Sequence, residues 1–158
     1  WGEDRTREWL EGIVANEATV YAKNTPTVAA TGAGEVEVGF VNHYYLHRFL
    51  AEEGDGFAAR NYFLPGGGPG SAVLVAGAAI LKTAENGPQA NRFLEYLLSE
   101  EAQTYFAEET YEYPLIDGVA HSELLPGLDT LNTPDIDISD LGDLEATQNL
   151  LQEAGALQ

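Results

Sequence analysis

The stretch VGFVNHYYLHR, residues 38–48, predicts the change from strand to helix around which the chain is organised. Its first residues continue an alternating pattern that is typical of a strand, and the chain then turns at Asn42 into a helix. The turn places two adjacent phenols, those of Tyr44 and Tyr45, beside the end of the strand. In an open α/β sheet, ligands bind beyond the carboxyl ends of the strands. We therefore expect a ligand site at this turn.

Hydrophobic patterning predicts further strands and helices along the chain. The expected strands are residues 18–23, 35–41, 58–64 and 72–82. The expected helices are residues 6–14, 26–31, 43–53, a long helical region that starts at 85–88, a helix capped by Ser99, and residues 141–154, opened by Ser139 and Asp140. Residues 72–82 are apolar almost throughout, which is typical of a strand that is buried on both faces.

The charge of the chain excludes one class of partner. The 158 residues carry a formal net charge of −19, and no Lys or Arg follows Arg92, whereas fifteen Asp and Glu residues do. Such a surface repels nucleic acid and anionic membranes, so we expect no nucleic-acid partner. The chain also has no Cys, which excludes disulfides, thiolate metal sites and Cys nucleophiles within it.

The sequence contains no Met, and it opens directly on Trp1. We therefore expect a processed product or a fragment of a longer protein. No apolar run reaches the length of a membrane span. With 44% hydrophobic residues, the chain suffices for one ordinary core or for parts of two small ones.

Asn24 stands between an expected strand and a helix that is expected to begin at Pro26. The free backbone N–H groups and the dipole of a helix N-terminus attract anions. Asn24 therefore has two interpretations: a plain helix cap with no further role, or a side chain that helps to bind an anion. The residue pattern alone leaves both open.

Two histidines near the tyrosine pair suit a different metal. His43 and His47 are four residues apart, so a helix would place them on one face, as a zinc site requires. No acidic residue is spaced to complete such a site, and we expect His47 and His121 to be ordinary surface residues. Arg48 lies one helical turn after Tyr44, where it either stabilises a phenolate or pairs with a carboxylate.

Signatures of catalysis are missing from the sequence. The glycine-rich run at residues 65–71 does not end in the Gly-Lys-Ser/Thr of a phosphate-binding loop, and no Gly-x-Ser-x-Gly is present. We therefore expect a binding protein and not an enzyme. A hydrolase that uses His43 or His121 is the remaining catalytic alternative.

Several segments resemble the ferric-iron-binding substrate proteins of ABC transporters, and they occur in the same order. They are the tyrosine-pair segment 38–48, the strand 77–82, the helix pair 90–103, the stretch Tyr111-Glu112-Tyr113-Pro114-Leu115 and the terminal helix. Only the Tyr-Tyr segment is specific for iron; the others mark the wider class of solute-binding proteins. The resemblance implies an α/β fold like that of type II periplasmic binding proteins, with a mixed sheet flanked by helices and a ligand clamped between two lobes.

By this resemblance, the chain looks like the C-terminal half of such a protein and covers parts of both lobes. Residues 1–64 complete the second lobe and contain the tyrosine-pair segment, 65–71 form a Gly/Pro-rich connection, and 72–158 cross back to the first lobe and add the C-terminal helices. The other half would supply further metal ligands. We expect the fragment not to hold iron tightly alone, and we expect its exposed inter-lobe surface to favour self-association.

The resemblance also implies a function and a set of site residues. Tyr44 and Tyr45 would bind Fe³⁺, and Asn24 is similar to a position that contacts a synergistic anion, phosphate or carbonate. His43 and Arg48 would be supporting residues. The implied protein lies outside the cytoplasm, in the periplasm or as a cell-surface lipoprotein, and delivers ferric ion to the membrane permease of an ABC importer.

A binder of another small solute is the alternative within the same class. An organic cation or a phosphate ester would stack on the tyrosines or hydrogen-bond to them. The doublet alone also suits a structural pair, with one tyrosine in the core and the other on the surface, because neighbouring helical residues diverge by about 100°. Convergence of the two phenols requires the irregular backbone of a strand-to-helix turn.

Overall fold

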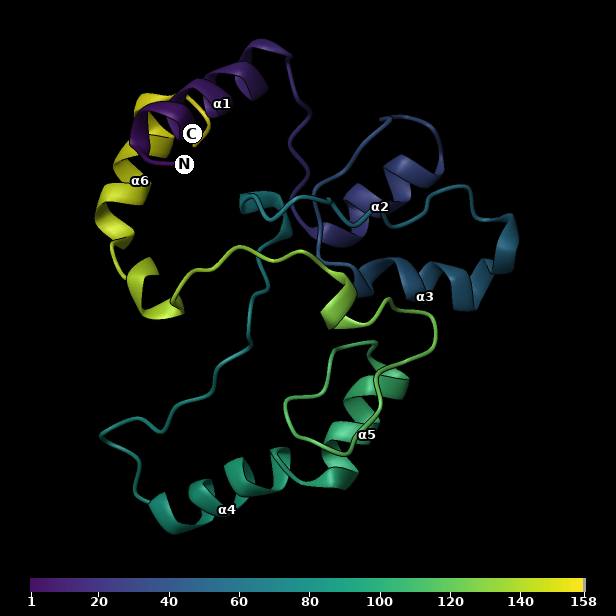
Figure 1. Ribbon diagram of the computed structural model, residues 1–158, viewed down its shortest axis with the longest axis vertical. Helices are drawn as coiled ribbons and strands as arrows, with labels where there is room; N and C mark the ends of the chain where they lie inside the picture. The colour runs from purple at the N-terminus through teal and green to yellow at the C-terminus, as the bar shows by residue number, and fades with distance from the viewer. Residues whose placement is uncertain (158) are drawn as a thin grey trace.

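The computed structural model describes residues 1–157, except for the side chains of residues 138 and 140. The α-helices of this part are α1 (Glu3–Ala15), α2 (Asn24–Gly32), α3 (Tyr44–Glu53), α4 (Gly87–Leu97), α5 (Glu100–Glu109) and α6 (Leu144–Glu153). Its 3₁₀ turns are η1 (Gly54–Gly56), η2 (Pro69–Ser71), η3 (Leu128–Thr130) and η4 (Ile138–Leu141). The helices pack as the pairs α1–α6, α2–α3 and α4–α5, and Figure 1 shows these pairs joined by long extended segments.

The pair α2–α3 is held together by a small apolar cluster. Val28 of α2, Leu46 of α3 and Phe57, which follows η1, are buried in it. The ring of Phe57 stacks on that of Phe49, with centroids 4.9 Å apart and planes at 15°. Gly32 at the end of α2 makes room for this ring, because a Cβ there would overlap it. The cluster therefore sets the direction of α3 against α2.

The first and last helices lie side by side, so the two ends of the described chain are close together (Figure 1). Leu10 of α1 and Ala154 after α6 are buried. Arg7 of α1 forms ion pairs with Glu3 at 3.0 Å and with Glu153 of α6 at 2.9 Å. Both carboxylates are exposed, so apolar packing contributes more than these ion pairs to the contact between the helices.

Helices α4 and α5 meet at Ser99, whose hydroxyl accepts a hydrogen bond from the Ala102 N–H, as predicted for a cap. Gln103 of α5 is buried and uses both ends of its amide. Its Nε2 donates to the carbonyl of Leu97 at 2.7 Å, and its Oε1 accepts from the N–H of Leu115 at 2.7 Å. One buried amide thus ties the end of α4 and the segment after α5 to α5 itself.

The four predicted strands do not form a sheet within the described residues. The segments concerned are not helical, but no backbone hydrogen bond joins any two of them: 18–23, 35–41, 58–64 and 72–82. Alternation predicts an extended chain, whereas a strand also needs a neighbour that completes a ladder of hydrogen bonds. None of these four segments has such a hydrogen-bonded neighbour within the described residues.

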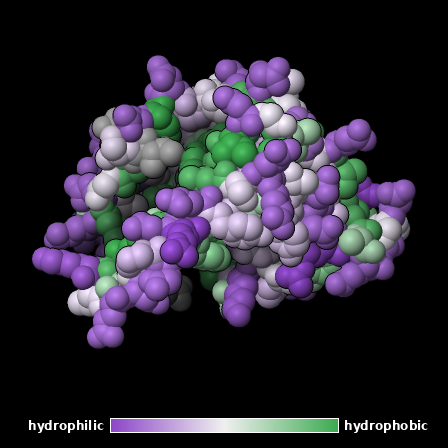
Figure 2. Space-filling model, turned by 90° about the horizontal axis from the view of Figure 1, so that it is seen from below, coloured by the Kyte–Doolittle hydropathy of each residue, from purple (hydrophilic) through white to green (hydrophobic). Residues whose placement is uncertain are grey.

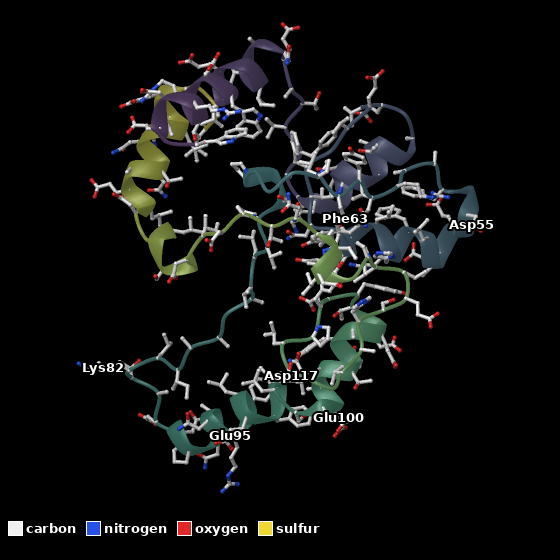
Figure 3. All side chains as sticks on the ribbon, viewed as in Figure 1. Asp55, Phe63, Lys82, Glu95, Glu100 and Asp117 are labelled. Atoms are coloured by element: carbon white, nitrogen blue, oxygen red, sulfur yellow. The ribbon has the colours of Figure 1, made fainter. Side chains whose placement is uncertain are left out.

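The prediction that residues 72–82 are buried on both faces is wrong for this chain. Leu74 is 73% exposed and Leu81 is 76% exposed. Figure 3 shows Lys82 at the outer end of this segment, away from the helix pairs. A continuous apolar run predicts burial because water disfavours it, but it does not identify what covers it.

The start of the last helix also differs from the prediction. Helix α6 begins at Leu144 because Asp143 caps it: the carboxylate accepts a hydrogen bond from a backbone N–H 2.9 Å away. Ser139, which was predicted to open the helix, lies in η4, where its N–H and hydroxyl donate to Asp137. The side chain of Asp140 lies outside the described residues.

Much apolar surface is exposed on this chain. Figure 2 shows hydrophobic side chains, in green, gathered at the centre of one face between polar side chains in purple. Large apolar side chains in and just after α4 are also uncovered, since Phe93 and Leu98 are exposed. Of the helices in residues 1–157, none combines the length and apolarity that crossing a membrane requires.

Because the Phe57 ring packs against Gly32, alanine should destabilise the protein at this position and stabilise it at an open helical glycine. Gly32→Ala should lower the free energy of unfolding by about 1–3 kcal/mol, because the buried ring cannot move away from the added methyl group. Gly12→Ala in α1 is the matched control; its Cβ would contact nothing within 4 Å, and alanine should stabilise the helix by up to about 1 kcal/mol. Urea unfolding of both variants tests this, and equal effects would contradict the packing.

Candidate functional site

The turn before α3 is held close to α2. Gly39 lies against that helix: a Cβ at this position would be 2.7 Å from Thr27 Cγ2 and 2.9 Å from Thr31 Oγ1. Glycine at position 39 therefore lets the chain lie against the threonine side chains of α2. The N–H of Tyr45 then donates to the carbonyl of Asn42 at 3.3 Å, which closes the turn. Helix α3 begins at Tyr44, one residue later than the sequence predicted.

The two tyrosines converge at the first turn of α3. Their ring centroids are 4.7 Å apart and the ring planes are tilted by 37°. Both side chains are half-buried, and that of Tyr45 also packs against the Val28–Leu46–Phe57 cluster. Asn42 Nδ2 donates to the Tyr44 hydroxyl at 3.1 Å. The phenols are thus side by side, an arrangement that the ligand interpretation requires.

The environment of Tyr44 favours its neutral form. Burial raises the pKa of this phenol most, and the neighbouring Tyr45 hydroxyl raises it further. The hydrogen bond from Asn42 lowers the pKa, and the charge of Glu112 raises it. A phenol with a pKa above its usual value of about 10 is protonated at neutral pH. Only a cation that binds the oxygen would release the proton.

His43 connects this turn to the segment that follows α5. Its Nε2 lies 2.6 Å from the carbonyl oxygen of Tyr111, and a carbonyl only accepts, so the proton is on Nε2. The imidazole centroid is 5.5 Å from the ring of Tyr44, 5.5 Å from that of Tyr113 and 6.1 Å from that of Phe63. Figure 3 labels Phe63 beside α2 and α3. The structure therefore places His43 among aromatic rings next to the pair.

His47 is not the surface residue that the sequence predicted. It is 5% exposed, and neither of its ring nitrogens has a hydrogen-bond partner among the described residues. Its imidazole stacks on the ring of Tyr111 at 4.4 Å and 22°. The i, i+4 spacing gave no sign of this, because the covering residue comes from a distant part of the sequence. His121 is half-buried and its Nδ1 bonds to the carbonyl of Ser122.

Neither predicted role of Arg48 is seen among the described side chains. The residue is exposed, and the ion pairs in this part of the chain are formed by Arg7 alone. Asn24 is the first residue of α2, and the cap position is taken by Lys23, whose side chain makes no capping bond. The plain-cap interpretation of Asn24 is therefore not supported, and its half-buried side chain stands at a helix start with free N–H groups.

Residues 111–113 are the part of the site that sequence reasoning missed. Tyr111 contacts both histidines, Glu112 acts on the phenol of Tyr44, and Tyr113 lies next to His43. In the sequence this stretch carried only a resemblance to the wider class of solute-binding proteins, and nothing marked it as part of the site. No residue pattern signals the contact, because Tyr111 lies 68 residues after His43 in the sequence. Groups of three or more His, Cys, Asp or Glu that could hold a metal are absent from the described residues.

Residues 4–112 match the family described as bacterial extracellular solute-binding protein. The chain belongs to this family. The chain is similar in structure to iron-bound HitA from Pseudomonas aeruginosa, with a TM-score of 0.88 and 29% sequence identity. The superposition covers 96% of this chain and 49% of the HitA chain. This solute-binding chain therefore has the type II periplasmic-binding-protein fold that the sequence predicted, even though no sheet forms within residues 1–157.

Curated relatives of this solute-binding chain carry names that refer to iron. The major ferric iron-binding protein of Neisseria meningitidis serogroup B is 32% identical over 155 residues, which are 98% of this chain and 46% of the relative. Iron uptake protein A2 of Synechocystis sp. is 36% identical over 163 residues, which cover 98% of this chain and 47% of the relative. The chain spans about half the length of the curated relatives it matches.

The burial of His47 predicts a pH-dependent stability. Burial lowers the pKa of His47, and the nearby His43 lowers it further. In the unfolded chain a histidine takes up a proton near pH 6.5, whereas folded His47 stays neutral to lower pH. The unfolded state therefore binds more protons, and stability is lost as the pH falls below about 6.5.

The measurement is the unfolding temperature of the metal-free protein between about pH 7.5 and 5. His47→Phe keeps an aromatic ring beside Tyr111 and removes the titrating group. The wild-type protein should lose more stability on acidification than this variant does. An identical decrease in both proteins would show that His47 does not contribute.

Proposed function

We propose that this chain forms part of an extracytoplasmic substrate-binding protein that captures ferric iron for an ABC importer. In this proposal Tyr44 and Tyr45 bind the ion as phenolates. The observation that supports it most directly is the convergence of the two rings, 4.7 Å between centroids, at the start of α3. The relatives named for ferric iron binding and iron uptake support the identity of the ion. The chain's membership of a solute-binding family supports a role in binding without a chemical step.

The chemistry of the pair suits this ion. Ferric iron is a hard cation and prefers anionic oxygen donors, and two phenolates supply two of them. Because the pKa of Tyr44 is raised, this phenol carries no charge before the ion arrives. The ion displaces the phenolic protons as it binds. The remaining coordination positions are filled by an anion and by ligands from outside this chain, so the chain alone holds iron weakly.

Asn24 is the proposed contact for the anion, a phosphate or a carbonate. Helix α2 begins at this residue, and the side chain at its cap position, Lys23, accepts no hydrogen bond from the free N–H groups of its first turn. Backbone N–H groups and the helix dipole favour negative charge at such a position. An anion there would offset part of the metal charge. His43 supports the site from beside Tyr44, and Arg48, which is exposed, would act only through its charge.

The proposal divides the chain between two lobes. Residues 1–64 belong to one lobe, 65–71 form a connection, and 72–158 cross to the other and then add the C-terminal helices. The packing of α4 with α5, separate from the α2–α3 pair, supports this division, and α6 returns to pack on α1. The membrane permease of the importer receives the ion. The exposed apolar surface would also favour self-association.

A colour change tests the tyrosine pair. Addition of ferric ion to the full-length protein, with both lobes present, should produce a visible phenolate-to-iron charge-transfer band, which Tyr44→Phe and Tyr45→Phe should each weaken and the double variant should abolish. Tyr62→Phe is the matched control, because this tyrosine is 76% exposed and lies outside the turn. A protein that stays colourless would contradict the iron proposal, and an organic cation or a phosphate ester would then be the alternative solute.

Ferric affinity should fall as the pH falls, because protons compete for both phenolates. Binding should release about two protons per ion from the pair, and about one in Tyr45→Phe. Competition with a chelator between about pH 8 and 6, corrected for protonation of the chelator, gives the proton count. The same count in the variant and the wild-type protein would exclude Tyr45 as a ligand.

A further inference from the structure

The end of α5 meets the tyrosine turn through one residue, Tyr111. Its carbonyl oxygen accepts the Nε2 proton of His43 at 2.6 Å, and its ring stacks on the imidazole of His47 at 4.4 Å. The two histidines flank Tyr44 and Tyr45 in the sequence, one on each side. Tyr111 thus contacts the turn both before and after the tyrosine pair.

The backbone of Tyr111 has an uncommon conformation. Its φ is +59°, in the left-handed region where residues other than glycine are rare. Such a conformation persists only where the surroundings determine it. On the α5 side, the N–H of Glu112 donates to the carbonyl of Phe106 at 3.0 Å, and Gln103 binds the N–H of Leu115. The segment after α5 is therefore attached to α5 independently of its contact with the turn.

His47 contributes to this contact through the face of its ring. The side chain is buried, but neither nitrogen has a hydrogen-bond partner among the described residues. A buried imidazole without partners is costly, so hydrogen bonding does not explain its position. The stacked ring of Tyr111 is the aromatic contact that covers it.

We infer that Tyr111 is a positioning residue for the tyrosine pair. By binding His43 through its carbonyl and His47 through its ring, Tyr111 fixes the first turn of α3 against the α4–α5 pair. The phenols of Tyr44 and Tyr45 are thereby held at one separation before a ligand arrives. This inference rests on the proposed function, in which the pair binds ferric ion, and it assigns to Tyr111 a role in the affinity for that ion without direct contact.

Three substitutions of Tyr111 separate its ring from its backbone. Tyr111→Gly keeps the left-handed backbone and the carbonyl but removes the ring, so ferric affinity should fall by about tenfold or more, as it does when partners of metal ligands are lost. Tyr111→Phe keeps the ring and should bind iron as the wild-type protein does. Tyr111→Ala removes the ring and strains the backbone, so its affinity should be at or below that of the glycine variant.

A structural control distinguishes positioning from loss of stability. Leu10 is buried in α1, the helix that packs on α6. Leu10→Ala should lower the unfolding temperature and leave ferric affinity unchanged. A second readout needs no iron: the backbone amides of residues 42–46 should exchange hydrogen faster in Tyr111→Gly than in Tyr111→Phe or the wild-type protein.

The outcomes are separable from those of the proposed function. If Tyr111→Gly binds ferric ion as tightly as the wild-type protein, or if Leu10→Ala loses as much affinity, the positioning role is wrong. If the wild-type protein shows no charge-transfer band, the proposed function fails, and hydrogen exchange alone then decides whether Tyr111 orders the turn. Unchanged exchange at residues 42–46 in Tyr111→Gly would overturn the inference in either case.

Discussion

The packing of the Phe57 ring between α2 and α3 is the contact on which the rest of this site depends. The ring stacks on Phe49 and occupies the space that Gly32 leaves free, so the two helices are held in one relative orientation. Gly39 then brings the preceding segment against α2. Because close-packed side chains tolerate little displacement, this small cluster determines where the chain turns into α3. The tyrosines stand at that point.

The negative charge of the protein has different consequences for the cation and for the anion of the proposed site. A net charge of −19 attracts cations to the surface but repels anions. The phenol pair needs no fixed charge to take up a cation, since the ion generates the phenolates as it binds. An anion, by contrast, must be bound against the overall field, which requires local groups such as the free N–H groups at the start of α2.

His43 and His47 show what the spacing of residues predicts about a structure and what it does not. Their i, i+4 spacing would place them on one face of a helix, but α3 begins at Tyr44, after His43. The separate expectation that His47 is an ordinary surface residue is wrong, because His47 is buried beneath Tyr111. The partner is contributed by a segment beyond α5, and neither spacing nor hydropathy contains information on a contact over this separation. The same reason applies to residues 72–82, whose apolar character was evident but whose covering partner was not.

The sequence by itself determined most of the helices, the serine cap of α5 and the turn into α3. These follow from local physics, since the spacing of apolar residues and the hydrogen bonds of a cap lie within a few residues of one another. Only the tertiary structure decided that the two phenols converge, that His47 is buried and that Tyr111 adopts a left-handed backbone to contact both histidines. The directions of the two phenols depend on the backbone of the turn, which Gly39 brings against α2. The burial of His47 and the contacts of Tyr111 depend on segments that are distant in the sequence and become neighbours only when the chain packs.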